Sequence, residues 1–168
     1  MEYSISKNRE RASEIDWIIT YLEKNPNFSD SLGINLMRLN YSDEFSIISS
    51  AYESLKSTGW DIISSNTLKK AIINVYEFEY KKAMKLIDNG DFTRQDREST
   101  FFAERFIYDE LNQMIPNSYV DLRNEQLFKN FISARKAWKI VKVRHMEGMN
   151  EKTKDLLSLV EKELEDNL

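Results

Sequence analysis

The feature that most constrains this chain is its C-terminal stretch, which contains no proline after Pro116 and a single glycine, Gly148. From Asp121 onward, apolar side chains recur every three or four positions, the spacing that gathers them on one face of an α-helix. The pattern stays in register across Gly148, so we expect one helix from near Asp121 to the end, continuous or gently kinked. The predicted seam comprises Leu127, Phe131, Ala134, Trp138, Val141, His145, Met149, Thr153, Leu156, Val160 and Leu164.

A shorter seam of the same kind occupies the N-terminal segment. Its members are Ile5, Asn8, Ala12, Ile15, Ile19 and Leu22. Pro26 cannot continue a helix because it has no amide hydrogen, so this helix is expected to end just before it. Since both seams have the three–four spacing of packed helices, we expect 1–24 to lie antiparallel against 121–168 as a stalk-like helix pair.

The residues between these two segments, 28–116, are expected to form a helical core. Ser29 or Asp30 can cap a short helix running through Leu39, because a side-chain oxygen there can accept a free amide hydrogen of the first turn. The segment 40–49 is the least regular part of the sequence. Four glycines and two prolines leave little material for a β-rich fold. All 168 residues are thus predicted to form a single all-α domain, an irregular helical bundle.

Helix signals are densest in residues 50–90. Ser50 and Glu53 fit a capping box, in which the two side chains satisfy each other's free backbone amides. Gly59 stands where a C-terminal residue with a positive φ angle is favoured. We therefore expect a short helix between Ser50 and Gly59.

Two longer helices are expected to follow. Ser64 or Ser65 can cap the first, which Gly90 is expected to end. The second is expected to begin near Thr93 and to stop before Pro116. The apolar residues of both helices keep the spacing of a buried face.

A family resemblance lies in the same region. The residues that carry it are Ala51-Tyr52-Glu53-Ser54-Leu55-Lys56-Ser57, Gly59 and Asp61-Ile62-Ile63-Ser64, with the segments 21–25 and 30–32. Over 15–90 the chain resembles an uncharacterised bacterial family of single-pass membrane proteins with a helical domain of unknown function. The resemblance implies a short cytoplasmic piece and one membrane-spanning helix ahead of a periplasmic domain. We expect the chain to be soluble as given and the native protein to be anchored in the inner membrane; the alternative is a cytoplasmic member without an anchor.

The net charge and the composition exclude several classes of function. A net charge of −4 argues against a general nucleic-acid binder, which needs a basic surface. The absence of cysteine excludes disulfides, thiolate nucleophiles and zinc fingers. No run of the sequence approaches the roughly 20 apolar residues that cross a bilayer.

Catalytic patterns are missing as well. His145 is the single histidine, and it lies on the C-terminal seam, where a packed side chain is the simplest interpretation. Neighbouring carboxylates on a helix point apart and so do not form a general acid–base pair. No glycine-rich phosphate loop or nucleophile elbow is present. We expect no enzymatic activity, no cofactor and no metal.

One charged feature stands above the background. Between Phe128 and Met146 there are six basic residues and no acid, and Arg135, Lys139 and Lys142 share one helical stripe. Such a stripe is a candidate binding site for an anion, either a phospholipid headgroup, a polyanion or an acidic protein surface. The alternative is that these cations pair with acids on adjacent helices.

These observations favour a non-enzymatic interaction or scaffold domain of a bacterial envelope protein. Its partner would be a protein or an anionic membrane surface, and no nucleic acid is expected. The alternative is a small-molecule sensor with a pocket between helices 65–88 and 101–114, because aromatic side chains are concentrated there. An enclosed pocket with convergent polar groups would favour the sensor.

Overall fold

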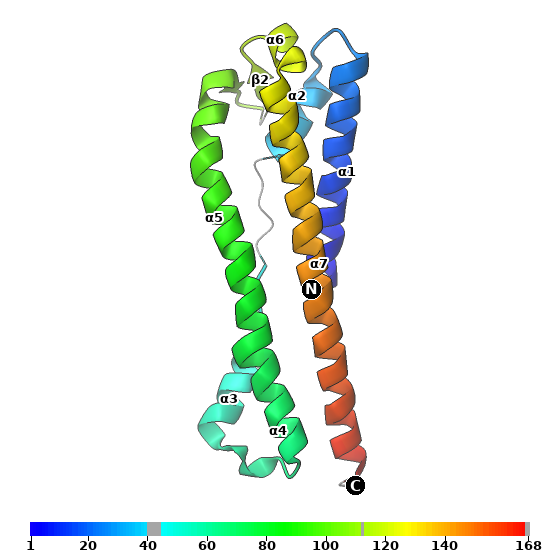
Figure 1. Ribbon diagram of the computed structural model, residues 1–168, viewed down its shortest axis with the longest axis vertical. Helices are drawn as coiled ribbons and strands as arrows, with labels where there is room; N and C mark the ends of the chain where they lie inside the picture. The colour runs from blue at the N-terminus through cyan, green and yellow to red at the C-terminus, as the bar shows by residue number, and fades with distance from the viewer. Residues whose placement is uncertain (40–44, 112, 167–168) are drawn as a thin grey trace.

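The computed structural model describes residues 1–39, 45–111 and 113–166, and their side chains except those of 92–97. The fold is an elongated all-α bundle, as predicted (Figure 1). Two antiparallel rods run its length, and shorter helices cover them. In chain order the elements are α1 (Glu2–Lys24), α2 (Asp30–Arg38), α3 (Ser50–Thr58), the 3-10 turn η1 (Trp60–Ile62), α4 (Asn66–Ile73), the π-helical segment η2 (Asn74–Glu79), α5 (Tyr80–Arg105), β1 (Phe106–Tyr108), β2 (Met114–Pro116), α6 (Tyr119–Asn124) and α7 (Gln126–Asp166).

The predicted antiparallel contact between the first and last helices is confirmed. Near the start of α7, Arg123 of the preceding α6 donates to the carbonyl oxygen of Leu22 at 3.1 Å. Further along α7, Lys136 pairs with Asp16 at 2.5 Å. Later still, Glu147 pairs with Arg9. Residue numbers fall along α1 as they rise along α7, and α7 continues unbroken through Gly148.

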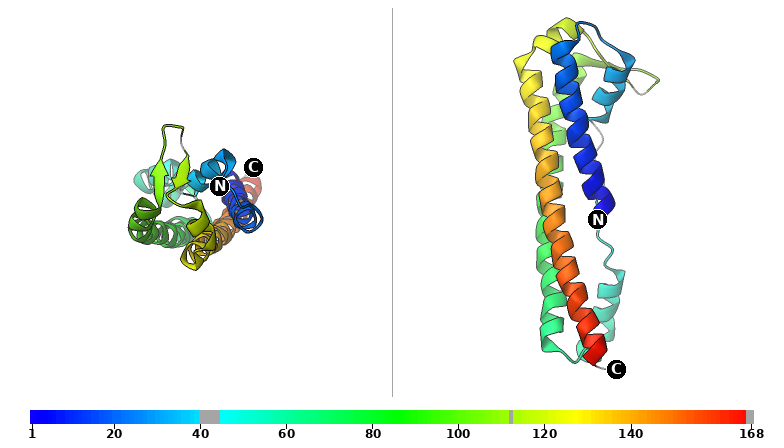
Figure 2. Two further views of the ribbon diagram at one scale, coloured as in Figure 1. Left: turned by 90° about the horizontal axis from the view of Figure 1, so that it is seen from above. Right: turned by 90° about the vertical axis from the view of Figure 1, so that its right-hand side faces the viewer.

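The buried line of α7 is shifted from the predicted seam. Phe128, not Leu127, is fully buried at the start of the helix, and Leu127 is 57% exposed. The fully or nearly fully buried positions are Phe128, Ile132, Lys142, Val143, Met146 and Met149. The reason is that α7 has α1 on one side and α5 on the other (Figure 2), so its most buried line lies between the two contacts.

The second rod consists of α4, η2 and α5 without a break, so the predicted helix end at Gly90 is wrong. Gly90 is required there for another reason. A Cβ atom at this position would lie 2.1 Å from Cζ2 of Trp138, so only glycine lets the indole of α7 lie against the backbone of α5. The glycine marks a close approach between the two rods.

The helix expected to reach Pro116 ends instead at Arg105. A short antiparallel hairpin follows, with Ile107 opposite Ile115, and it is the one sheet in the described residues. Its turn is held by Asp109, whose Oδ1 accepts the amide hydrogens of Leu111 and Gln113 at 3.0 and 2.7 Å. Three-residue strands leave the all-α architecture intact.

Local helix signals are mostly confirmed. Ser29 and Ser65 each accept the amide hydrogen three residues on, and Gly59 has a φ of 105° at the end of α3. The capping box is wrong by one residue: the N-cap of α3 is Ser49, with no side-chain cap bond. The irregular segment predicted at 40–49 lies outside the described residues at 40–44, and residues 45–49 carry no regular secondary structure.

The interior is divided along the rods. One cluster fills the end that contains α1, α2, the hairpin and α6, which we call the α1 half. Two further clusters lie toward the end that contains α3, η1, α4 and η2, which we call the α3 half. The pair formed by α1 and α7 is joined by α5, which lies along α7 from Tyr80, bonded to Thr153, to Arg105, bonded to Glu125 just before α7 begins.

Candidate functional site

The predicted basic stripe faces the inside of the bundle. Arg135 pairs with Glu98 of α5, and both side chains are largely buried. It also donates to the carbonyl oxygen of Leu39, at the end of α2. Lys139 is half-buried. The stripe therefore uses the charge of Arg135 within the fold, the arrangement given above as the alternative to anion binding.

Lys142 is the most buried charged residue of the stripe. Its side chain is 0% exposed, and Nζ lies 2.7 Å from Oδ2 of Asp91 on α5. The other oxygen of this carboxylate accepts the indole N–H of Trp138 at 2.7 Å. A buried ammonium group is tolerated only with such a partner, because desolvation of an unpaired charge is expensive. Sequence spacing located the stripe on one face but could not show which face α5 would cover.

These residues belong to a polar layer through the bundle, which we define as Asn8, Asp91, Glu98, Arg135 and Lys142. On each long helix the layer lies between residues of the α1-half cluster and residues of the next cluster. Asn8 is fully buried, donates to the carbonyl oxygen of Ser4 at 2.8 Å, and leaves its Oδ1 without a protein partner. The layer thus interrupts the hydrophobic interior over about two helical turns, from Arg135 to Lys142 on α7.

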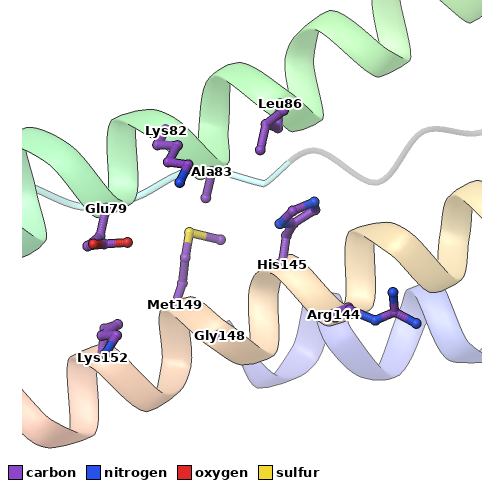
Figure 3. A pocket seen from close by; sticks show the side chains of 9 residues that line it. All are labelled: Glu79, Lys82, Ala83, Leu86, Arg144, His145, Gly148, Met149 and Lys152. Carbon is purple, nitrogen blue, oxygen red and sulfur yellow. The ribbon is translucent and has the colours of Figure 1, made fainter.

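The sensor pocket predicted between 65–88 and 101–114 is not formed as expected, because 101–105 continue the same rod as 65–88 and the rest of the second segment belongs to the hairpin. A groove of about 230 Å³ is found instead between α5 and α7 (Figure 3). His145 lies on its α7 side, half-buried, beside Met149. The charged residues that line it are Glu79, Lys82, Arg144 and Lys152.

The π-helical segment η2 presents a second polar cluster. Oε1 of Glu77 accepts the Tyr52 hydroxyl at 2.7 Å and the Lys56 ammonium at 3.0 Å, and Lys81 pairs with the other oxygen. Hydrogen bonds from Lys81, Tyr52 and Lys56 lower the pKa of Glu77 to about 2. Burial and the bond to Glu77 raise the pKa of Tyr52 to about 12. Because Tyr52 also stacks on Tyr76 at 4.5 Å, the cluster fixes α3 to the rod.

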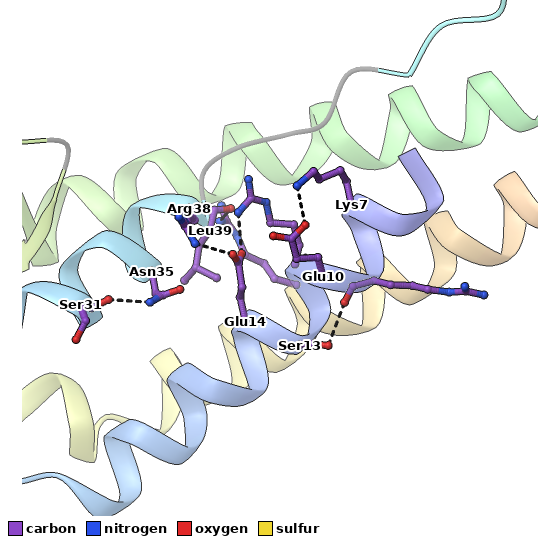
Figure 4. Close-up of polar contacts among 11 residues, drawn as sticks. Lys7, Glu10, Ser13, Glu14, Ser31, Asn35, Arg38 and Leu39 are labelled. Atoms are coloured by element: carbon purple, nitrogen blue, oxygen red, sulfur yellow. Dashed lines mark hydrogen bonds and ion pairs between the residues drawn. The ribbon is translucent and has the colours of Figure 1, made fainter. Parts of the chain in front are cut away.

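An ion pair also connects α2 to α1 (Figure 4). Glu14 of α1 accepts hydrogen bonds from Arg11, at 2.7 Å, and from Arg38 of α2, at 2.9 Å. Lys7 and Glu10 form a further pair one turn away, at 2.7 Å. The Arg38–Glu14 pair joins neighbouring elements, as the pairs of the polar layer do, whereas the other two pairs lie within α1. None of the three needs a ligand to explain it.

The C-terminal end of α7 behaves differently from the rest of that helix. Five helical turns contain 18 residues, so Phe128, Met146 and Leu164 project from the same side of α7. Phe128 and Met146 are 0% exposed, whereas Leu164 is 61% exposed. The predicted seam placed Leu164 inside; the structure places it at the surface, because the cover that buries the other two does not reach it.

The side of α7 that carries Leu164 packs against α1 nearer the middle of the helix and is exposed toward its C-terminal end. Val143, Asn150, Leu157 and Leu164 follow one another at intervals of seven, which keeps them on one stripe. Val143 shares a hydrophobic cluster with Ile5, and Asn150 lies beside Glu2 and Ile5, at the start of α1. Beyond that point Leu157 is 54% exposed. Figure 2 shows α1 ending partway along α7.

The other side of this end of α7 is occupied. Leu156 and Val160 are half-buried against the cluster that contains Tyr52. Glu163 accepts the hydroxyl of Ser64 at 2.5 Å and the amide hydrogen of Ser65 at 2.9 Å, which fastens the helix to the start of α4. The uncovered face, defined as the exposed side of α7 that carries Leu157 and Leu164, is therefore held on a rigid support. It is the candidate functional site.

Comparisons add no assignment to this picture: no family model, curated protein or solved structure matches the chain. Within the described residues, no group of three or more His, Cys, Asp or Glu side chains is placed to hold a metal ion. None of the described helices has the length and apolar character needed to span a membrane.

Proposed function

We propose that this chain is a non-enzymatic interaction domain, and that its partner contributes a helix that packs along the uncovered face of α7. The observation that carries the proposal is the contrast between Met146 and Leu164, which occupy equivalent positions five turns apart. The first is covered by protein and the second by solvent. Exposed apolar side chains grouped on a rigid element are typical of protein contact sites.

The chemistry of the face favours a protein partner over an anionic membrane surface. Its apolar positions are flanked by charges of both signs, Lys154 and Glu161 among them. An anionic bilayer attracts a surface of uniformly positive charge, whereas mixed charge beside a leucine stripe is typical of helix-to-helix pairing. Two cations of the predicted anion-binding stripe, Arg135 and Lys142, already have carboxylate partners inside the fold.

Site-specific photo-crosslinking in the native cells tests the proposal. A photo-reactive amino acid at Leu157 should give an adduct with another polypeptide chain. The matched control is Leu127, which lies at the opposite end of the same helix with a similar exposure. We expect a discrete adduct from position 157 and none from position 127. No adduct from 157, or the same adducts from both positions, would contradict the proposed function.

A small-molecule sensor is the second candidate, favoured by the groove between α5 and α7. Lys82 and Lys152 flank an apolar floor that includes Met149, an arrangement suited to a small organic anion. Since His145 is the single histidine, its ring signals report on this groove without ambiguity in NMR. Titration with inorganic phosphate should shift them, and Lys82→Gln should weaken the effect. A matched change on the same helix, Lys85→Gln, should leave it unchanged.

We further propose that the native protein is anchored in the inner membrane of a bacterium, with this domain in the periplasm. The support is the resemblance over 15–90 to a family of single-pass proteins. The retention of positive residues on the cytoplasmic side would set this orientation. A reading frame upstream of Met1 that encodes about 20 apolar residues would agree with an anchor. Recovery of the native protein in the soluble cytoplasmic fraction would exclude it.

A further inference from the structure

The charges beside the uncovered face have a regular arrangement. Lys154 precedes Leu157 by three residues and Glu161 follows it by four, so they lie about one turn before and one turn after it on the same side of α7. Both side chains are exposed. The two charges are opposite in sign and nearly symmetric about Leu157. A surface of this kind is complementary to itself when it is turned end for end.

We propose that the helix that covers this face is α7 of a second copy of the chain, packed antiparallel about a two-fold axis close to Leu157. This inference rests on the proposed function, because it names the partner of the same face. A two-fold axis between residues 157 and 158 sets Lys154 of each chain opposite Glu161 of the other. It also brings the two Leu157 side chains together. One patch then serves both subunits, as in most symmetric dimers.

The contact between α1 and α7 supplies the pattern for this pairing. There, an antiparallel helix packs on the same side of α7, with ion pairs at its edge such as Lys136 with Asp16. In the dimer, a second α7 takes the place of α1 beyond Asn150, and the pairs of Lys154 with Glu161 take the edge positions. The antiparallel direction of the helices and the pairing of opposite charges at their edge are thus the same as in the contact already present.

The length of the face agrees with this arrangement. From Asn150 to Asp166 the helix extends about 24 Å, at 1.5 Å per residue. In an antiparallel pair each chain contributes this segment. Two helical segments of this length form a contact smaller than a standard interface, so the association is expected to depend on concentration.

Disulfide trapping tests the geometry directly, because the chain contains no cysteine of its own. In the Leu157→Cys variant the two introduced thiols lie near the axis, so mild oxidation should give a covalent dimer. The Leu127→Cys variant carries a thiol of similar exposure outside the proposed contact and should remain monomeric under the same conditions. Equal dimer yields from the two variants would overturn the proposal.

A charge exchange tests the pairing independently of cysteine chemistry. By sedimentation equilibrium, Lys154→Glu and Glu161→Lys should each weaken dimerisation at least about tenfold, because each puts like charges opposite at two places. The double variant Lys154→Glu with Glu161→Lys restores both pairs and should recover the dissociation constant of the unmodified chain. A double variant as weak as the single ones would contradict the pairing.

The experiments distinguish failure of the self-pairing proposal from failure of the proposed function. A chain that stays monomeric at all concentrations, while the photo-reactive group at 157 captures a different polypeptide in cells, overturns self-pairing and leaves the interaction domain standing. An adduct with the mass of two copies, together with a Leu157→Cys disulfide, supports both. If neither the adduct nor the disulfide forms, both proposals are contradicted.

Discussion

The two halves of the molecule share the same pair of antiparallel rods and differ in what covers them. In the α1 half, α1, α2, the hairpin and α6 enclose the rods, and Phe128 has no exposed surface. In the α3 half, α3 and η1 cover one side, while Leu157 and Leu164 remain at the surface. The same helix is thus an interior element at one end and a presented surface at the other. A periodic apolar sequence does not distinguish these two situations.

The two halves also differ in how their contacts are made. The α1 half is joined by a continuous cluster of aliphatic and phenylalanine side chains, with Phe101 stacked on Phe131 at 4.8 Å. The α3 half combines two smaller apolar clusters with bonds between hydroxyls and carboxylates, such as Tyr52 with Glu77 and Ser64 with Glu163. Apolar burial stabilises at any pH, whereas bonds to a carboxylate depend on its ionisation. The α3 half is therefore expected to be the weaker and the more pH-sensitive end.

The largest expected difference comes from truncating equivalent positions of α7. Phe128→Ala should lower the free energy of unfolding by about 3–5 kcal/mol, since it empties a fully buried site. Leu164→Ala, on the same side of the helix, should change it by less than about 0.5 kcal/mol, as exposed substitutions do. Urea denaturation at a protein concentration low enough to favour the monomer measures both. Equal losses would show that the end of α7 is covered within the monomer.

Next in size is the effect of removing a partner from the polar layer between the halves. Asp91→Ala leaves the fully buried Lys142 ammonium without its carboxylate, and should cost about 3 kcal/mol. Lys142→Met, which removes the charge and keeps the volume, should cost less, because Asp91 is partly exposed and can be hydrated. If Lys142→Met proves the more damaging of the two, the layer is held by something other than this ion pair.

A glycine exchange tests the close approach of the two rods. Gly90→Ala should destabilise by about 1–3 kcal/mol, because the added methyl group collides with the Trp138 ring. Gly148→Ala is the matched control. It lies in α7 with nothing within 4 Å of an added Cβ, so the alanine should stabilise the helix by about 0.5–1 kcal/mol. Similar effects at the two sites would contradict the contact between Gly90 and Trp138.

The smallest expected effect concerns pH and the α3 half. The pKa of Glu77 is lowered to about 2 in the fold, so its contribution is complete above the ordinary carboxyl pKa and is lost as the pH falls toward about 2. Tyr52 has a raised pKa, so its contribution is complete below the ordinary tyrosine value and is lost as the pH rises toward about 12.

Tyr52→Phe should cost about 1 kcal/mol at neutral pH, the usual value of one hydrogen bond. Hydrogen exchange of the α3 amides, followed from pH 7 down to acid, measures the local effect. Amides of α2, in the α1 half, serve as the control. Protection in α3 that does not fall sooner than protection in α2 would show that the Glu77 cluster does not hold α3 in place.

Much of the fold could be read from local chemistry. The end of α1 and the start of α2 were located correctly, because Pro26 acts through its backbone geometry and Ser29 through its hydrogen bond to the first turn. The continuous α7 followed from its unbroken three–four spacing. Gly90 was misread for an equally physical reason: glycine serves both as a helix end and as a point of close approach, and only the position of Trp138 separates these uses.

The sequence likewise showed only part of the candidate site. The basic stripe was visible as a pattern, but the burial of Lys142 depends on Asp91, which lies 51 positions away in the chain. Leu157 was not singled out because one apolar position on a helix resembles any other. Its exposure depends on which part of α7 packs against α1, which no local pattern contains.

The sequence by itself determined that this chain is helical, that its longest helix is unbroken, and that its first and last helices lie antiparallel. The first two properties follow from side-chain periodicity and capping, which act over a few residues, and the third was inferred from the matching apolar seams of the two helices. The tertiary structure alone decided which charges are paired, which glycine is a contact and which leucines remain exposed. These depend on distances between segments far apart in the chain, so the same side of α7 is buried at Met146 and exposed at Leu164.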